Sequence, residues 1–177
     1  RTAARGGVGA VMGSKNLKAL VITAQHNLCL ADPQTFKQLV REQVALNQNS
    51  RLYQHHKQMG TTDTQDITNM LGIFPVKNFR HGQHSEYPKL IGEQYKKFRV
   101  GEFGCYSCSA RCGKVHRVIE GPYAGARNEG PEYETIWALG AMCGVDNLEA
   151  ITKANYLCNE LGMDTMSAGV TIALSLI

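Results

Sequence analysis

Three cysteines lie within eight residues of this chain, at Cys105, Cys108 and Cys112, and they read C-x2-C-x3-C. These short gaps let one tight loop place three thiolates around a common centre. Loops of this kind hold iron–sulfur clusters, often with a fourth cysteine from far along the chain. Structural zinc sites have two C-x2-C pairs or one pair and two histidines, and only His116 is close enough to complete such a set locally. The spacing therefore favours a cluster over zinc, and over free or disulfide-bonded cysteines.

The bulk composition is that of a soluble globular protein. Hydrophobic residues make up 43% of 177 residues, which suffices for one sizeable domain or two small ones. The net charge of +4 is scattered, and the basic run at 96–99 is interpreted as a solvated helix face rather than a nucleic-acid-binding stripe. We therefore expect no nucleic-acid partner. No apolar run reaches the roughly 18 residues of a membrane helix, so we expect no membrane partner either.

The other cysteines and the chain ends bear on cellular context. Cys29, Cys143 and Cys158 lie in apolar surroundings, which suits a reducing cytoplasm better than an oxidising compartment. The chain has no starting methionine and no signal peptide, opens in a glycine-rich motif and stops inside the apolar stretch 168–177. We therefore expect a cytoplasmic location, and an internal piece of a longer protein.

Helical patterns dominate the chain after residue 30. Asp32 and Pro33 form a helix start, because the first residue caps and proline suits the first turn. Apolar residues at helical spacing predict helices over 32–47, 52–59, 61–70, 91–98, 131–142 and 147–161, and a last helix opening at 164–167. Asp146 is the expected cap of the helix that Gly162 ends. Strand-like stretches are predicted at 17–23, 114–119 and 124–128.

The first thirteen residues form a glycine-rich segment, R-T-A-A-R-G-G-V-G-A-V-M-G. Glycines permit positive φ values and a close approach of the backbone to a ligand. One interpretation is a phosphate cradle helped by Arg1, Arg5 and Lys15, and another is a tight helix-to-strand connection. The segment does not match G-x4-G-K-[ST]. A dinucleotide-binding interpretation fails too, because no strand precedes the glycines and we expect no helix after them.

Three separated segments occur in a specific order. They are the glycine-rich opening, C-Y-S-C-S-A-R-C at 105–112 followed by G-P-E-Y-E-T at 130–135, and N-E-L-G-M-D-T at 159–165. Together they resemble the aldehyde:ferredoxin oxidoreductase family of tungsten–pterin enzymes. The resemblance implies a mostly α fold: residues 1–28 are the C-terminal, β-containing end of a β-rich pterin-binding base domain, and residues 29–177 are the first helical domain and the start of the second.

The family resemblance also implies the cofactors and the reaction. A tungsten or molybdenum ion held by two pterins lies beside a [4Fe-4S] cluster, and Cys105, Cys108 and Cys112 are three of its four ligands. By resemblance, the family's fourth cysteine lies further along than this chain. Cys143 or Cys158 could substitute, but both are interpreted as buried apolar residues. The implied enzyme is anaerobic and oxidises a small aldehyde to a carboxylic acid, and ferredoxin or another electron-transfer protein accepts the electrons. This chain alone is expected to be inactive.

The resemblance assigns residues to the pterin as well. In the opening loop these are Arg1, Thr2, Ala3, Ala4 and Arg5. Small residues let the backbone reach the cofactor, and arginine offers a planar fork to phosphate. The third segment resembles the family's D-x-x-G-L-D loop and adds Asn159, Met163 and Asp164, with Asn159 in place of the first aspartate. Taken alone, Asp164 is better explained as a helix N-cap.

Two glutamates of the G-P-E-Y-E-T segment, Glu132 and Glu134, are the candidate catalytic residues. By resemblance, a glutamate in this region points at the metal, where it activates water or takes up a proton. Glu134 is slightly preferred. Without the resemblance, both are explained by the dipole of the helix that begins there. The family's catalytic histidine lies beyond residue 177.

Some family members carry E-x-x-H for an iron that bridges two subunits, and the matching positions here are Lys153 and Tyr156. Neither suits iron, so we predict no bridging iron, while a homodimer through other contacts stays open. One alternative on the same scaffold is a class II benzoyl-CoA reductase-like catalytic subunit. An alternative of another class is an iron–sulfur electron carrier or a zinc-stapled binding module, in which the opening and the N-E-L-G-M-D turn have no role.

Overall fold

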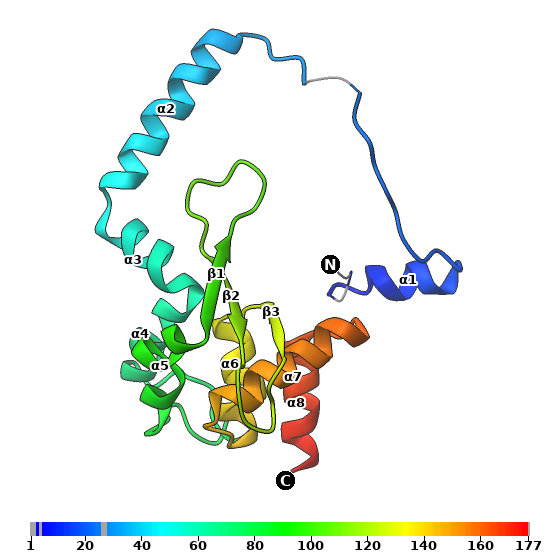
Figure 1. The fold of residues 1–177 in the computed structure, drawn as a ribbon, viewed down its shortest axis with the longest axis vertical. Coiled ribbons are helices and arrows are strands. Elements are labelled where there is room, and N and C mark those ends of the chain that lie inside the picture. The colour runs from blue at the N-terminus through cyan, green and yellow to red at the C-terminus, as the bar shows by residue number, and fades with distance from the viewer. Residues whose placement is uncertain (1–2, 4, 26–27, 177) are drawn as a thin grey trace.

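The computed structural model describes residues 3, 5–25 and 28–176. The fold is mostly α, as predicted, and it contains one small antiparallel sheet (Figure 1). Helix α1 (Val8–Ser14) is joined by a long segment to α2 (Pro33–Asn49), which projects from the body of the molecule (Figure 1). Then come α3 (Arg51–Met59), the 3₁₀ helix η1 (Gly60–Asp63) and α4 (Thr64–Met70). In the part described, no helix has the length and apolarity to cross a bilayer.

The predicted helix starts and stops are mostly confirmed by their caps. Asp32 Oδ1 accepts from the backbone N–H groups of the first turn of α2, at 3.0 and 3.1 Å. Gly162 ends α7 (Leu148–Leu161) in the left-handed conformation. The cap predicted at Asp146 is wrong by one residue. Asn147 accepts from the Ala150 N–H at 2.9 Å, while the Asp146 carboxylate accepts from Lys89 at 3.1 Å.

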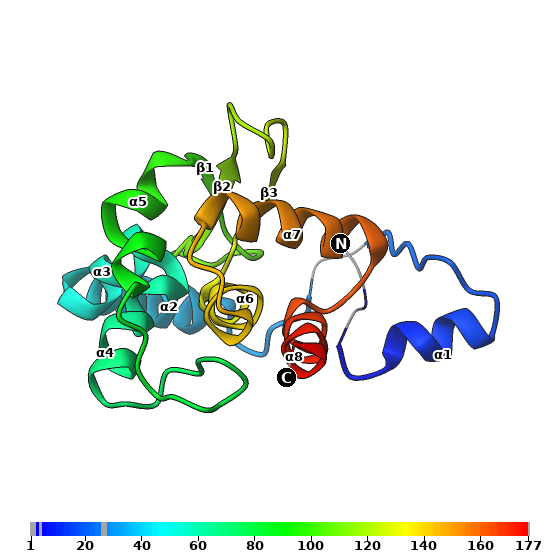
Figure 2. The same ribbon diagram turned by 90° about the horizontal axis from the view of Figure 1, so that it is seen from below.

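The sheet has three strands in the order β1-β2-β3: β1 (Arg99–Phe103), β2 (Gly113–Arg117) and β3 (Arg127–Glu129). The predicted strands at 114–119 and 124–128 correspond to β2 and β3, whereas β1 was not predicted. It follows closely on α5 (Gly92–Lys97), in a segment between the predicted helix 91–98 and the cysteine loop to which no element was assigned. Helix α7 packs beside β3, and α6 (Tyr133–Leu139) packs against α8 (Thr165–Ser175) (Figure 2).

The predicted strand at 17–23 is wrong, because residues 17–25 have no regular structure. A strand needs a hydrogen-bonded neighbour, and among the described residues no strand pairs with this segment. Its apolar side chains stay in solvent, with Val21 87% exposed. The glycine-rich opening also differs from expectation, because a helix does follow its first glycines: Gly7, at φ 75°, precedes the first turn of α1.

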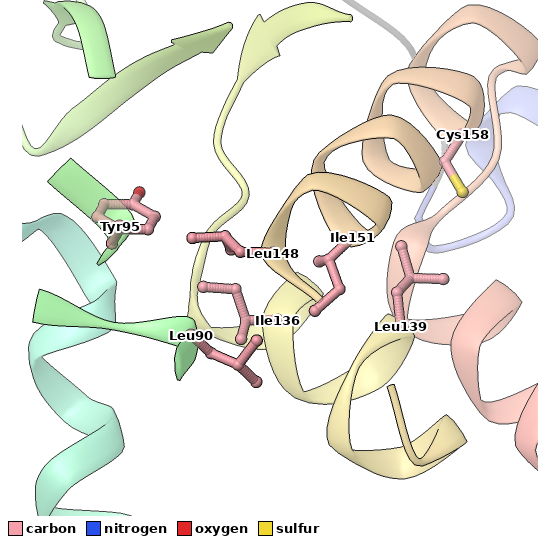
Figure 3. Packing of buried hydrophobic residues seen from close by; sticks show 7 residues of the cluster. All are labelled: Leu90, Tyr95, Ile136, Leu139, Leu148, Ile151 and Cys158. Atoms are coloured by element: carbon pink, nitrogen blue, oxygen red, sulfur yellow. The ribbon is translucent and has the colours of Figure 1, made fainter. Parts of the chain in front are cut away.

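The main core is formed by seven side chains from η2 (Tyr87–Leu90), α5, α6 and α7 (Figure 3): Leu90, Tyr95, Ile136, Leu139, Leu148, Ile151 and Cys158. Helices α6 and α8 approach closely at Gly169, where a Cβ atom would lie 2.3 Å from the carbonyl oxygen of Ala138. A smaller cluster of Phe74, Val76 and Ala141 of η3 (Ala141–Cys143) packs beside Tyr133 and Trp137. These contacts hold α5, α6, α7 and α8 together.

Candidate functional site

An open cavity of about 620 Å³ is lined by the N-terminal segment, the sheet, α7 and the α7–α8 turn. Asn155 and Asn159 are one helical turn apart on α7, so both side chains face it. The Asn155 amide donates to the carbonyl oxygen of Glu129 at 2.9 Å, which ties α7 to the end of β3. Arg127 of β3 adds a cation to the wall. The cavity therefore presents amide, carboxylate and guanidinium groups together.

Asp164 connects the N-terminal segment to the start of α8. Arg5 Nε donates to Asp164 Oδ1 at 2.5 Å, while Oδ2 accepts from the Ser167 N–H at 2.9 Å and from its hydroxyl at 2.8 Å. Burial raises the pKa of the Asp164 carboxyl, but the hydrogen bonds from Arg5 and Ser167 lower it to about 2. The carboxylate is thus ionised at neutral pH. It is an N-cap, and its remaining lone pairs can accept from a ligand.

Four of the residues predicted to bind the pterin line this one cavity: Arg5, Asn159, Met163 and Asp164. Ala3 lines a neighbouring hollow of about 610 Å³, which α1 and Gly162 also line. Its carbonyl oxygen accepts from the Gly9 N–H at 3.2 Å. The other predicted contacts lie outside the described residues: Arg1, Thr2 and Ala4.

Of the two candidate glutamates, Glu132 lines the cavity and Glu134 does not. Glu132 lies directly before α6, and the half-buried Glu134 lies in its first turn. The Thr61 hydroxyl donates to Glu132 Oε2 and accepts from the Tyr133 N–H at 2.9 Å, so it holds both the carboxylate and the start of α6. Thr61 was not predicted, because no local pattern reveals a partner 71 residues away.

The hairpin loop between β1 and β2 contains the three predicted cluster ligands: Cys105, Cys108 and Cys112. The Cys108 N–H donates to the carbonyl oxygen of Cys105 at 3.0 Å, which forms a turn. Cys105 and Cys108 are exposed and Cys112 is half-buried. Burial and the Glu132 carboxylate raise the pKa of the Cys112 thiol. Within the described residues, no three His, Cys, Asp or Glu side chains converge as a metal site.

A fully buried lysine, Lys114, lies at the base of this loop. Its Nζ donates to the carbonyl oxygens of Lys57 at 2.5 Å and Arg111 at 3.2 Å, and to Glu102 Oε2 at 3.4 Å. Burial holds the pKa of the Lys114 ammonium below its usual value, and the Glu102 carboxylate offsets this in part. The sequence predicted a strand here but contained no signal for a buried charge.

His116 does not complete a zinc set with the three thiols. Its ring is 1% exposed, with Nδ1 at 2.7 Å from the carbonyl oxygen of Gly130 and Nε2 at 3.1 Å from that of Tyr95. Burial lowers the pKa of the imidazole, although both carbonyls raise it. Both ring nitrogens are therefore engaged by backbone groups rather than available to a metal.

Lys153 and Tyr156, which occupy the positions of the E-x-x-H pair, contact each other on α7. Lys153 Nζ lies 4.7 Å from the centre of the Tyr156 ring, a cation–π contact. The Tyr156 side chain also lines the cavity.

Comparison with known proteins adds a family match. Residues 38–176 match the family model described as aldehyde ferredoxin oxidoreductase, domains 2 and 3. The chain is similar to the tungsten-containing aldehyde ferredoxin oxidoreductases of Pyrococcus furiosus (43% identity) and Thermococcus kodakarensis (39%), over 99% of this chain and 29% of each relative. An aliphatic sulfonate oxidoreductase, WOR-like subunit, of Pyrococcus furiosus is 28% identical over 93% of this chain and 26% of its own length. The chain thus spans 29% of the length of the first two relatives.

Proposed function

This chain belongs to the aldehyde ferredoxin oxidoreductase family, and we propose that it is part of an enzyme that oxidises aldehydes to carboxylic acids. The proposed cofactors are tungsten or molybdenum held by two pterins, and a [4Fe-4S] cluster. Tungsten is favoured, because both aldehyde ferredoxin oxidoreductase relatives are described as tungsten-containing. Ferredoxin or another electron-transfer protein accepts the electrons, in an anaerobic cytoplasm. A homodimer, if formed, lacks a bridging iron.

The cavity that gathers Arg5, Asn159 and Asp164 beside Glu132 is the observation that supports this proposal most. Its donor set fits a pterin cofactor, because guanidinium groups bind phosphate and carboxylate or amide oxygens accept from pterin N–H groups. When bound, the metal–pterin group supplies the two-electron redox chemistry. Arg5 and Arg127 would hold phosphate, and Asp164 and Asn159 would orient the pterin ring.

Glu132 is the proposed proton acceptor. Oxidation of an aldehyde by water releases protons, so a carboxylate in the cavity has a role in the reaction. Thr61 donates to Oε2 of Glu132, which leaves Oε1 as the atom that takes up a proton. The choice of Glu132 over Glu134 follows from the cavity lining.

The three loop cysteines are the proposed ligands of the cluster. Thiolates are the ligands that iron–sulfur clusters use, and three of them in one hairpin loop suit that role. Because the three side chains do not converge in this structure, binding must reorient them. The fourth ligand would come from elsewhere in the whole protein.

An aliphatic sulfonate is a second candidate substrate. The aliphatic sulfonate oxidoreductase subunit of Pyrococcus furiosus aligns with 93% of this chain. The higher identity to the aldehyde oxidoreductases, 43% against 28%, favours an aldehyde. Ferredoxin reduction by the full-length protein, measured with an aldehyde and with an aliphatic sulfonate as alternative substrates, distinguishes the two.

Elemental analysis of the full-length protein, purified without oxygen, tests the proposal as a whole. We expect about one tungsten or molybdenum and about four irons per chain, because a [4Fe-4S] cluster holds that number. A Cys108→Ser variant should lose iron and sulfide. Zinc without tungsten or molybdenum would contradict the oxidoreductase and leave a structural zinc module.

A further inference from the structure

We infer that the buried ammonium group of Lys114 is a positioning group for the cysteine loop and sets the reduction potential of the cluster bound there. The inference rests on the proposed cluster. It assigns a role to a charged side chain that the cavity chemistry does not use, at the base of the loop that contains Cys112.

The contacts of Lys114 indicate that its amine is protonated. Three acceptors surround Nζ: the carbonyl oxygens of Lys57 and Arg111 and the carboxylate of Glu102. An ammonium group has three N–H donors, one for each acceptor, whereas a neutral amine has two and leaves one acceptor unpaired. The Glu102 carboxylate, 3.4 Å from Nζ, completes an ion pair with the ammonium group.

The same lysine joins the loop to the corner between α3 and η1. Its Lys57 contact is to a carbonyl in the last turn of α3, where the helix dipole favours a cation. Gly60, at φ +66°, ends α3 against the loop, and a Cβ atom there would lie 2.8 Å from the carbonyl oxygen of Cys112. Nζ also holds the Arg111 carbonyl directly before Cys112. The contacts of Gly60 and Lys114 thus locate Cys112.

The charge of Lys114 acts on a cluster in this loop. A reduced cluster carries one more negative charge than an oxidised one, so a nearby cation stabilises the reduced form and raises the reduction potential. Water screens a buried charge little. The Glu102 carboxylate opposes this effect, but its side chain is 43% exposed, so screening weakens its contribution. The Lys114–Glu102 pair therefore acts on the cluster as a net positive charge and raises its reduction potential.

The test is a redox titration of the cluster, followed by electron paramagnetic resonance, in the full-length protein purified without oxygen. Lys114→Met should shift the potential to a more negative value and lower the iron retained per chain. Glu102→Gln removes the opposing charge and should shift the potential to a more positive value. Lys97→Met, which removes one positive charge from an exposed position on α5, is the matched control and should leave the potential unchanged.

Opposite shifts in the two variants support the inference, because general loosening of the loop would move both potentials the same way. Wild-type potentials in both variants, or shifts of equal sign, would overturn it. If Lys114→Met retains no cluster, a more positive potential in Glu102→Gln supports the inference and a wild-type potential overturns it. A wild-type protein without iron would instead overturn the proposed function, which keeps the two failures apart.

Discussion

Glu132 and Glu134 are two positions apart in sequence but lie in different surroundings. Glu132 has an extended backbone at the N-cap position of α6, whereas Glu134 lies within the first helical turn, so their side chains point in different directions. Glu132 lines the cavity and accepts a hydrogen bond from Thr61, while Glu134 lies half-buried in the first turn of α6. Their positions relative to the start of α6, rather than the motif, separate their roles.

Replacing Glu132 by glutamine should lower kcat by about 10²-fold or more, because general acid–base groups contribute that much. Tungsten and iron contents should stay at wild-type levels. Glu134→Gln is the matched control and should keep most activity. The check is aldehyde-dependent turnover alongside metal analysis of both variants. A larger loss in Glu134→Gln would move the proton acceptor to that residue.

The sequence located the site segments but could not arrange them. The cysteine spacing and the N-E-L-G-M-D turn are local patterns, so both are visible in the printed chain. The Thr61–Glu132 hydrogen bond and the burial of Lys114 depend on residues far apart in sequence. Such contacts arise only when the chain folds, which is why neither was predicted.

Helices and strands differed in how well local sequence predicted them. The starts of α2 and α8 and the end of α7 were predicted, because caps and apolar spacing are signals within a few residues. Strands depend on their neighbours. Residues 17–23 have strand-like composition but no partner among the described residues, whereas β1 has weaker composition and pairs with β2.

The corrected cap of α7 makes a prediction at this scale. Asn147→Ala should lower the free energy of unfolding by about 1 kcal/mol, because it leaves an N–H of the first turn unpaired. Asp146→Ala is the control. It removes only an exposed ion pair with Lys89 and should change the stability by less than about 0.5 kcal/mol. Denaturant unfolding of both variants tests this. Equal losses would contradict the assigned cap.

At the scale of the whole molecule, one ion pair joins the two ends of the described chain. Arg5 and Asp164 are 159 positions apart, and their contact brings the N-terminal segment to the α7–α8 turn. The body between them is held by the core of α5, α6 and α7 (Figure 3). The cavity is lined from both sides of this contact, so its shape depends on the ion pair.

The ion pair predicts a specific acid sensitivity. The pKa of Asp164 is about 2 in the folded protein, below its usual value near 3.9, so its stabilisation is complete above about pH 4 and is lost as the pH falls toward 2. Asp164→Asn keeps a capping side chain but loses the charge. The wild type should exceed this variant by about 1–2 kcal/mol at pH 5, since the Arg5 side chain is 58% exposed, and by little at pH 2.

Denaturant unfolding at several pH values measures this difference. Arg5→Gln should lose only part of the pH dependence, because Ser167 still donates two hydrogen bonds to the Asp164 carboxylate. A stability difference that does not change between pH 5 and pH 2 would mean that Asp164 contributes only as a cap.

The close fit of Gly60 against the Cys112 carbonyl also defines a sequence pattern by which distantly related proteins can be recognised. A side chain at position 60 would both strain the backbone and collide with the loop, so a chain built with this corner needs glycine there. A pattern search that requires glycine–threonine upstream of C-x2-C-x3-C, and G-P-E downstream, would separate such chains from unrelated proteins that share only the spacing of the cysteines.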